Sequence, residues 1–365
     1  MISKACIVGA YQTKLEQIAA YEDIDLTVVV PPRWREGGHT LHLERAHTDG
    51  YRLVVTPMVF NGSFHLHFYP RLCRILRESN PHICHIDEEP YNLATYLALH
   101  TARRQGARTL FFTWQNLRRR YPLPFRAMER FVHKHADAAM AGSEGASMVL
   151  REKGYEGPLR VIPQFGVDPD LFSPAPANAP HRPFTIGYAG RLVEEKGLHT
   201  LVDALAAFQG TWRLILVGRG PLRQALEERF SELGLKERVT FHDHVPSEEM
   251  PHYFRAMDTL VLPSLTRPNW KEQFGRVIVE AMACGVPVVG SDSGEIPHVV
   301  GDGGLVFPEG DARTLGKHLR TLRDDAPRRR TLGERGRERV LNHYTQSHIA
   351  AETVTLYRDL HEGAI

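Results

Sequence analysis

The chain has 365 residues, more than one domain normally contains, so its length predicts two domains. Its 45 Lys and Arg nearly balance its 43 Asp and Glu, and a formal net charge of +2 argues against a general nucleic-acid binder. Since no run approaches roughly 18 apolar residues and no signal-peptide core is seen, a cytoplasmic protein is expected.

The cysteines are few and never form a CxxC pair; they are Cys6, Cys73, Cys84 and Cys284. All four lie in apolar segments. This spacing argues against a zinc site or a disulfide framework, and it predicts reduced, buried thiols.

Short apolar segments alternate with helical patterns through the first half of the chain. The expected strands are 5–10, 25–32, 51–60, 82–87, 108–116, 138–143 and 159–165. The expected helices are 12–22, 91–106, 124–136 and 144–154. Apolar strands separated by helices of ten or more residues indicate a parallel sheet covered on both faces. Residues 1–168 are therefore predicted to form a Rossmann-like domain.

A stretch rich in Pro and Ala interrupts this pattern and predicts an interdomain linker over 169–183. The alternation then restarts and predicts a second doubly wound domain over 184–341. Its expected strands are 184–190, 212–218, 239–243, 259–264, 287–292 and 303–307, and its expected helices are 198–208, 222–234, 247–257 and 275–285. Ser247 is the predicted N-cap of the third helix. A final amphipathic helix within 342–365 is expected to pack back toward the N-terminal domain.

Three strand ends in the second half carry candidate ligand groups. The strand that ends at Gly190 leads into a loop with Arg191 and Lys196, and two cations near a helix N-terminus suit a diphosphate. Gly218 lies at a second strand-to-helix turn, and the loop before the third helix places Val245 where its backbone can meet a base. Plain connecting loops with solvated charges remain the alternative at all three places.

The segment "WKEQFGRVIVE" holds two glutamates, Glu272 and Glu280, around a predicted helix start at Gly275. Backbone amides at such a start are hydrogen-bond donors, and carboxylates accept hydrogen bonds from hydroxyls. The pair therefore suits a polyhydroxylated ligand. A solvated glutamate pair fits poorly, because Glu280 lies in the apolar run "VIVEAMA" and a buried carboxylate needs partners.

Three segments, "VIPQFGVDPDLFSP", "GYAGRLVEEKGLHTLV" and "FGRVIVEAMACGVPVVGSDSGEIPHVV", resemble the family 4, group 1 retaining glycosyltransferases. The resemblance covers nearly all of the C-terminal half and the hinge. It implies the GT-B fold, in which two Rossmann-like domains face each other across a cleft. It also implies transfer of a hexose from a UDP- or GDP-linked sugar to a saccharide or lipid-linked acceptor, with retained configuration, no metal and no further cofactor.

The same resemblance implies a role for each matching residue. Arg191 and Lys196 hold the diphosphate, and Glu272 binds the donor sugar. The residues assigned to the nucleotide sugar are Gly190, Gly218, Val245, Phe274, Gly275, Arg276, Val277 and Glu280, of which Glu280 meets the ribose. Fixed cations and helix-end amides would do the work of a metal ion.

The N-terminal half departs from the family at two places. Many members have a Gly-Gly loop after the first strand, whereas this chain has only Gly9 there. Many also have a histidine where this chain reads "DEEP". Glu88 is accordingly predicted as a catalytic residue and Glu89 as an acceptor contact, with a solvated acidic loop as the alternative.

Further acceptor contacts are predicted at loops that follow strands. The candidates are His65, His67, Trp114, Gln115 and Asn116, together with Gly9 and Glu89. The basic run 118–120 could meet anionic lipid on the inner face of a membrane, or it could simply be a solvated loop. A GT-B epimerase or hydrolase and a non-catalytic nucleotide-sugar binder are the competing functions, and the oligomeric state stays open.

Overall fold

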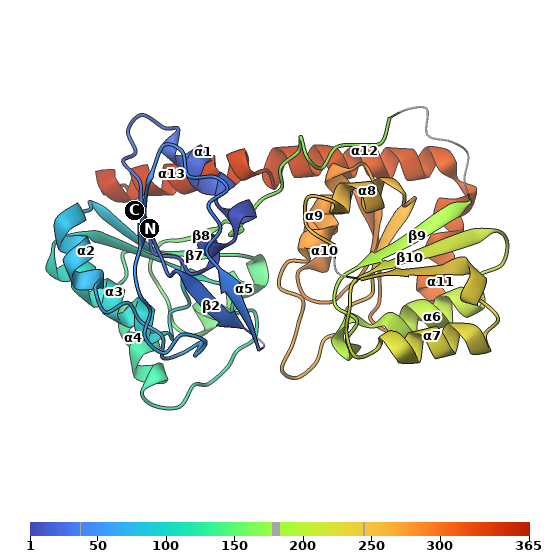
Figure 1. Cartoon of the computed structure of the whole chain (residues 1–365), viewed down its shortest axis with the longest axis horizontal. Helices are drawn as coiled ribbons and strands as arrows, with labels where there is room; N and C mark the ends of the chain where they lie inside the picture. The colour runs from blue at the N-terminus through green and yellow to red at the C-terminus, as the bar shows by residue number, and fades with distance from the viewer. Residues whose placement is uncertain (37, 177–182, 244) are drawn as a thin grey trace. The chain divides into compact units, whose positions relative to one another are not determined.

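The computed structural model describes residues 1–36, 38–176, 183–243 and 245–365 (Figure 1). It divides into two compact units, each considered by itself. Unit 1 comprises Met1–Gly166 and Gln346–Ile365, and unit 2 comprises Val167–Thr345. The predicted linker, 169–183, includes 177–182, which lie outside the described residues.

Unit 1 is built on a parallel sheet, as its sequence pattern predicts (Figure 1). Its strands are β1 (Thr27–Val30), β4 (Arg52–Val55), β5 (Ile83–Ile86), β6 (Arg108–Thr113), β7 (Ala138–Ala141) and β8 (Leu159–Val161). Ile2 forms parallel bridges to Val29 of β1 and to Ile86 of β5. The order across the sheet is therefore β4-β1-Ile2-β5-β6-β7-β8, with the first strand reduced to one residue.

The strand predicted at 5–10 is wrong. Those residues form the 3₁₀ turns η1 (Ala5–Ile7) and η2 (Gly9–Tyr11). The Gln12 amide donates to the Cys6 carbonyl at 2.9 Å, so a side chain satisfies a backbone acceptor within the turn. Cys6 is nonetheless fully buried. A short apolar run is compatible with a strand or with a buried turn, and its hydrophobicity does not distinguish them.

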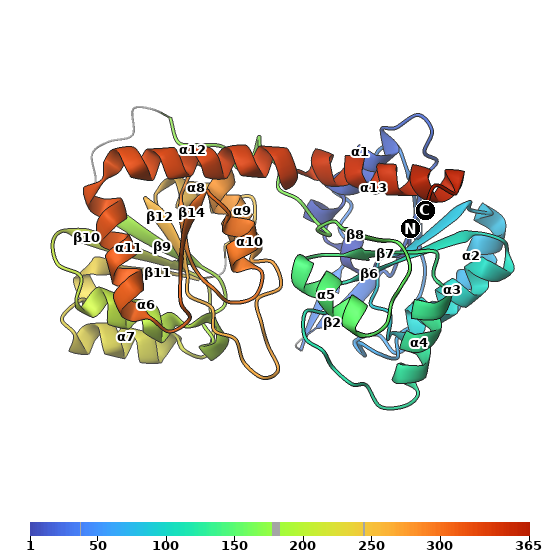
Figure 2. The ribbon, with the colours of Figure 1, turned by 180° about the vertical axis from the view of Figure 1, so that it is seen from behind.

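Helices cover both faces of the unit 1 sheet. They are α1 (Thr13–Ala19), α2 (Leu72–Ser79), α3 (Leu93–Arg104), α4 (Phe125–His135), α5 (Glu144–Glu152) and α13 (Gln346–Glu362). Successive residues of β6 point to opposite faces of the sheet and enter two hydrophobic cores. Leu110 and Phe112 pack in the first core with α1 and α13, whereas Phe111 packs in the second core with α2 to α4. The last helix, α13, lies against α1 (Figure 2). The cysteine prediction fails at Cys73, which is exposed on α2.

An antiparallel hairpin that the sequence pattern did not indicate precedes β4. It consists of β2 (Arg33–Glu36) and β3 (His39–His42). Trp34 of β2 is buried among the residues of the first core, while its neighbours Arg33 and Arg35 are exposed.

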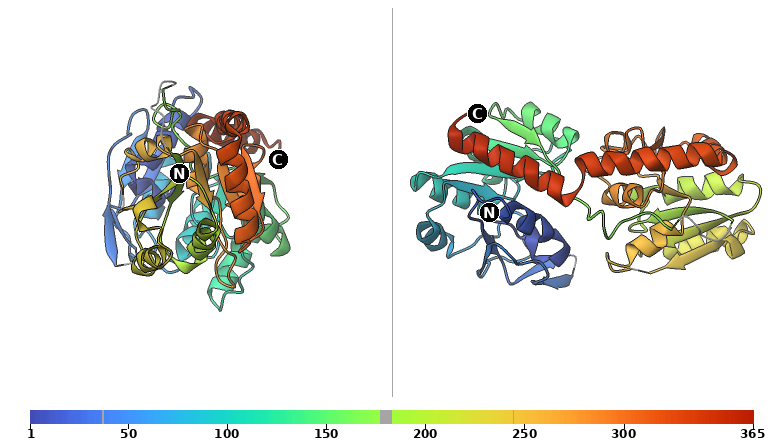
Figure 3. Two further views of the ribbon diagram at one scale, coloured as in Figure 1. Left: turned by 90° about the vertical axis from the view of Figure 1, so that its right-hand side faces the viewer. Right: turned by 90° about the horizontal axis from the view of Figure 1, so that it is seen from above.

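Unit 2 contains a six-stranded parallel sheet in the order β11-β10-β9-β12-β13-β14. The strands are β9 (Phe184–Ala189), β10 (Trp212–Val217), β11 (Val239–His242), β12 (Thr259–Leu262), β13 (Val288–Ser291) and β14 (Gly304–Phe307). The helices are α6 (Leu198–Ala206), α7 (Arg223–Glu232), α8 (Met250–Arg255), α9 (Arg276–Ala283), α10 (Ile296–Val300), α11 (Ala312–Asp324) and α12 (Ala326–His343). The long helix α12 packs on α9 (Figure 3). Both units are doubly wound, as predicted.

The predicted cap at Ser247 is wrong. Helix α8 begins at Met250, and Ser247 contributes its carbonyl to a turn by accepting from the Met250 amide at 3.3 Å. Pro251 lies in the first helical turn, where its missing N–H costs nothing and its fixed φ suits the helix.

In the part of the chain that the structure describes, no helix has the length and apolarity needed to span a bilayer.

Candidate functional site

The chain order of unit 2 reverses between β9 and β12, and ligands of doubly wound sheets bind at the carboxyl ends of strands at such a point. Here the loops that follow these strands are joined. The Leu265 amide donates to the Glu195 carbonyl at 2.8 Å. Gly197 adopts φ +66, and a Cβ on it would lie 1.9 Å from the Pro263 carbonyl oxygen. Only glycine permits this approach.

A charged pair links the two loops. Lys196 Nζ lies 2.5 Å from Glu272 Oε2, and the Ser264 hydroxyl donates to the same oxygen at 2.8 Å. The Lys196 ammonium also lies 4.9 Å from the centre of the Trp270 ring. Glu272 is only 7% exposed, so its carboxylate needs these donors. The pair places a cation and a carboxylate, both predicted site residues, at one point of the sheet edge.

The loop after β13 also contacts Glu272. The Glu295 amide donates to the Glu272 carbonyl at 3.2 Å. Gly294 has φ +57, and a Cβ there would lie 2.1 Å from the same carbonyl oxygen. No contact is predicted for this segment from the sequence.

The predicted glycines at the ends of β9 and β10 lie against each other. The Gly190 amide donates to the Val217 carbonyl at 2.9 Å, and a Cβ on Gly218 would lie 1.9 Å from the Gly190 carbonyl oxygen. Arg191, the next residue, is exposed and lies 3.4 Å from Glu195. Close packing of backbones therefore accounts for Gly218, while Arg191 presents its charge to solvent.

Helix α9 begins directly after Gly275, which has φ +76. Glu280 is buried at 5% exposure, and its carboxylate lies 2.8 Å from Arg276 Nε. Burial raises the pKa of Glu280 more than Arg276 lowers it. The structure thus excludes a solvated position for Glu280, as the apolar run predicted. Phe274 is buried as well, and its ring packs edge-on against Tyr344.

Two further predicted donor contacts lie at the edges of this region. Val277 is half-buried in the first turn of α9. Val245 follows β11 and is half-buried, while the preceding residue of the predicted base-binding loop, His244, lies outside the described residues.

In unit 1 the chain order of the sheet reverses at Ile2, between β1 and β5. Glu88 lies in the loop that follows β5 at this point. Its carboxylate pairs with the Lys4 ammonium, accepts from the Lys4 amide at 3.1 Å, and lies 3.6 Å from His67 Nε2. Burial alone would raise the pKa of Glu88, but Lys4 and His67 outweigh it and lower the pKa to about 2. Glu88 is therefore expected to be ionised at neutral pH.

This geometry changes the role expected of Glu88. Its side chain has no exposed surface, because Lys4 and His67 enclose it. The carboxylate thus orients the Lys4 ammonium, which retains 14% exposure, and does not itself face solvent. Sequence reasoning missed Lys4: a single lysine four residues from the start carries no motif.

Glu89 joins the loop after β5 to the end of β6. Its two carboxylate oxygens accept from the Thr113 hydroxyl at 2.7 Å and from the Trp114 amide at 2.8 Å. Burial raises the pKa of Glu89 to about 7, although both of these hydrogen bonds lower it. Glu89 is therefore expected to change between its protonated and ionised forms near neutral pH.

Replacing Glu89 with glutamine is expected to change the pH dependence of stability. The folded-state pKa lies above the unfolded value, so the wild type loses stability as pH rises from about 4.5 through about 7. The glutamine amide does not ionise, so the variant does not lose stability in this way. The Glu89→Gln variant should match the wild type near pH 5 and exceed it by about 2 kcal/mol at pH 8. Urea unfolding of both proteins at the two pH values measures this, and a gap that does not vary with pH contradicts it.

The predicted acceptor contacts after β6 make mainly internal contacts. The Trp114 indole donates to Gln164 at 2.8 Å. The Gln115 amide donates to the Tyr121 hydroxyl at 2.9 Å and accepts from Lys153 at 2.8 Å. Asn116 is also buried. These side chains shape the sheet edge, and Trp114 is the least buried of the three.

The two predicted histidines lie in different surroundings. His67 is buried beside Glu88, with Nδ1 3.0 Å from the Ser63 carbonyl. His65 lies among aromatic rings, 5.3 Å from Tyr91 and 5.0 Å from Phe125. Within the described residues, no three His, Cys, Asp or Glu side chains are grouped so that they could hold a metal ion.

Gly9 does not present its amide at the sheet edge. The amide donates to the Glu44 carboxylate at 2.5 Å, and a Cβ on Gly9 would lie 2.8 Å from Ala46 Cβ. A segment after β3 therefore covers this glycine, and its amide is not available for the predicted acceptor contact.

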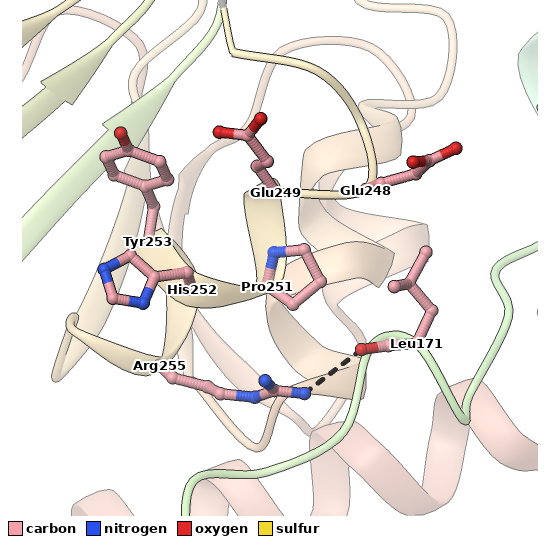
Figure 4. Close-up of a pocket in the computed structure, with 7 residues that line it drawn as sticks. All are labelled: Leu171, Glu248, Glu249, Pro251, His252, Tyr253 and Arg255. Carbon is pink, nitrogen blue, oxygen red and sulfur yellow. Dashed lines mark hydrogen bonds between the residues drawn. The ribbon is translucent and has the colours of Figure 1, made fainter.

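A hollow of about 330 Å³ lies elsewhere in unit 2, at helix α8 (Figure 4). Arg255 borders it and donates to the Leu171 carbonyl at 3.1 Å. None of the predicted site residues lines it.

Two family models match successive parts of the chain. Glycosyltransferase Family 4 matches residues 15–171, and Glycosyl transferases group 1 matches residues 172–339. The chain is 32% identical over 218 residues to the putative colanic acid biosynthesis glycosyltransferase WcaL of Escherichia coli, covering 58% of this chain and 54% of the relative. The chain thus matches about half the length of that relative.

A second relative matches along most of both chains. It is the GDP-mannose-dependent alpha-(1-6)-phosphatidylinositol monomannoside mannosyltransferase of Mycolicibacterium smegmatis, 29% identical over 360 residues, which cover 88% of this chain and 86% of the relative.

Two solved structures share the fold. Sucrose-phosphate synthase from Thermosynechococcus elongatus superimposes with a TM-score of 0.70 at 24% identity, covering 97% of this chain and 93% of the other. Anabaena Alr3699/HepE in complex with UDP superimposes with a TM-score of 0.73 at 20% identity, covering 98% of each chain.

Proposed function

Since this chain belongs to the family 4, group 1 glycosyltransferases of GT-B fold, we propose that it transfers a hexose from a nucleotide diphosphate sugar to a saccharide or lipid-linked acceptor. The observation that carries the proposal is the pairing of Lys196 with Glu272 where the chain order of the unit 2 sheet reverses. A sugar diphosphate needs both a cation for its phosphates and acceptors for its hydroxyls, and this pair supplies one of each.

The proposed reaction retains configuration at the anomeric carbon. The bond from C1 to the diphosphate oxygen breaks, and a bond to the acceptor oxygen forms on the same face of the sugar. The acceptor proton passes to the departing diphosphate. Lys196 and Arg191 stabilise the charge that develops on the leaving group, so the protein contributes positioning and electrostatics and no nucleophile of its own.

The remaining unit 2 residues complete the donor site in this proposal. Glu272 binds the sugar hydroxyls, and Glu280 accepts from the ribose. The backbone at Gly275 and the start of α9 face the phosphates, where the positive end of a helix favours an anion. Val245 meets the base through its backbone. No metal is required.

The names of the relatives support UDP- or GDP-linked hexoses as donors in this proposal. One is named as GDP-mannose-dependent, and one structural neighbour holds UDP. We therefore include both UDP- and GDP-linked hexoses as donors. The names of the relatives favour an acceptor of polysaccharide or glycolipid synthesis.

A panel assay tests the function. The purified full chain is incubated with UDP- and GDP-linked hexoses and with saccharide and lipid-linked acceptors, in the presence of EDTA. Release of UDP or GDP that depends on the acceptor is expected, with the donor anomer preserved in the product by NMR. An inverted product refutes the proposed mechanism. An epimerised donor, or free sugar formed equally well without acceptor, would instead establish one of the competing functions.

A further inference from the structure

The loop between β4 and α2 of unit 1 exposes apolar side chains. Val59, Phe60, Phe64 and Leu66 are 37%, 59%, 47% and 40% exposed. Residues 53–70 contain no Lys, Arg, Asp or Glu. Single exposed apolar residues are ordinary on protein surfaces, but four within eight residues form a local apolar surface.

Backbone hydrogen bonds hold this loop in a defined turn. Val59 bridges Phe68 in antiparallel fashion, and the Ser63 amide donates to the Phe60 carbonyl at 2.9 Å. Phe60 itself has φ +52, a conformation that a bulky side chain rarely adopts. The fold therefore holds a phenylalanine outward at a position that would suit asparagine or glycine better.

The backbone of two arginines is held beside this turn. Asn61 accepts from the Arg35 amide at 2.9 Å and donates to the Arg33 carbonyl at 2.6 Å. A Cβ on Gly62 would lie 3.0 Å from Arg35 Cβ, so the turn and strand β2 are in contact. Both arginine side chains are exposed.

The surroundings share this positive charge. Residues 33–78 contain seven arginines and four acidic residues, a formal charge of +3 where the whole chain carries +2, and one of these arginines, Arg74, pairs with Glu78. Apolar side chains that project beside arginines match the interface of a bilayer with anionic lipid, where the rings enter the headgroup boundary and the cations meet phosphates. A second copy of the same face would bring like charges together.

We infer that the turn at residues 59–66, with Arg33 and Arg35, docks unit 1 on an anionic phospholipid bilayer. This surface differs from the basic run 118–120 that the sequence suggested. It also differs from the proposed donor site, so vesicle binding does not depend on the proposed function.

Vesicle co-sedimentation of the full chain tests the inference, with vesicles of phosphatidylcholine alone and with one third phosphatidylglycerol. Phe60→Asn removes the most exposed ring and suits φ +52, so the fold is preserved. It should lower partitioning onto anionic vesicles about tenfold. Arg33→Gln and Arg35→Gln should each lower it about fivefold, and added salt should weaken binding of the wild type.

A matched control tests whether the loss of binding is specific to this surface. Met148 on α5 is 56% exposed, so Met148→Ser tests the loss of an apolar side chain elsewhere in unit 1 and should leave binding unchanged. Circular dichroism confirms that each variant is folded. The inference is overturned if Phe60→Asn binds as the wild type does, if zwitterionic vesicles bind equally well, or if only neutralising the basic run 118–120 abolishes binding. Self-association reduced by Phe60→Asn would identify a protein interface instead and also overturn it.

Discussion

Replacing Lys196 with methionine is expected to lower the rate of sugar transfer by about 100- to 1,000-fold. Fixed charges directed at a developing oxyanion typically contribute that much. In the structure Lys196 is held at the edge of the unit 2 sheet by Glu272, 2.5 Å away, and by the left-handed Gly197 that follows it. Nucleotide release at saturating acceptor measures the effect, with kcat and KM determined separately.

A double variant distinguishes a catalytic cation from a structural pair. If the pair were only structural, Lys196→Met combined with Glu272→Gln would remove both charges and restore activity, because no unpaired carboxylate would remain. If each side chain meets the nucleotide sugar, the double variant stays at least as impaired as the single one. We expect the second result. Recovery to within tenfold of the wild type would contradict the assignment of Lys196.

Replacing Lys4 with methionine is expected to lower the free energy of unfolding of unit 1 by about 3 kcal/mol at pH 7. Removing one partner of a buried ion pair leaves the other charge uncompensated. Here the remaining charge is Glu88, whose side chain is fully buried and would keep His67 Nε2, 3.6 Å away, as a neighbour. Adding Glu88→Gln to the variant should recover part of the loss, since a neutral amide is less costly to bury.

The pH dependence gives this prediction a second test. The folded-state pKa of Glu88, about 2, lies below its unfolded value. Its contribution is therefore present above about pH 4.5 and lost as pH falls toward 2. The difference between wild type and Lys4→Met should shrink over that window. Hydrogen exchange of peptides that contain β5 reports on unit 1 separately from unit 2. A difference that is equal at pH 3 and pH 7 would show that lost packing, not charge, is responsible.

The candidate residues of unit 2 were predictable because their signals are local. The apolar run around Glu280 indicated a buried carboxylate, and the structure leaves it 5% exposed. Gly275 before a helical pattern indicated the start of α9. Each of these inferences needs only residues within one or two helical turns.

The candidate residues of unit 1 were harder to predict, because their contacts are to residues far away in the sequence. The first strand is a single bridging residue, Ile2, whereas the apolar run at 5–10 that suggested a strand forms 3₁₀ turns. Gly9 is covered by a segment 35 residues away in the chain, and its amide donates a hydrogen bond to the Glu44 carboxylate in that segment. In the sequence Glu88 is typical of a solvent-exposed loop carboxylate, and no neighbouring residue indicates that it pairs with Lys4.

The sequence by itself determined that this protein has two doubly wound units and which strand ends carry charged and glycine-rich loops, because the alternation of strand and helix is written in neighbouring residues. Tertiary structure alone decided which of those loops meet. Lys196 pairs with Glu272 across 76 positions, and Lys4 with Glu88 across 84. In a parallel sheet, neighbouring strands are joined by long crossovers, so strand order and register determine which side chains come together at the edge.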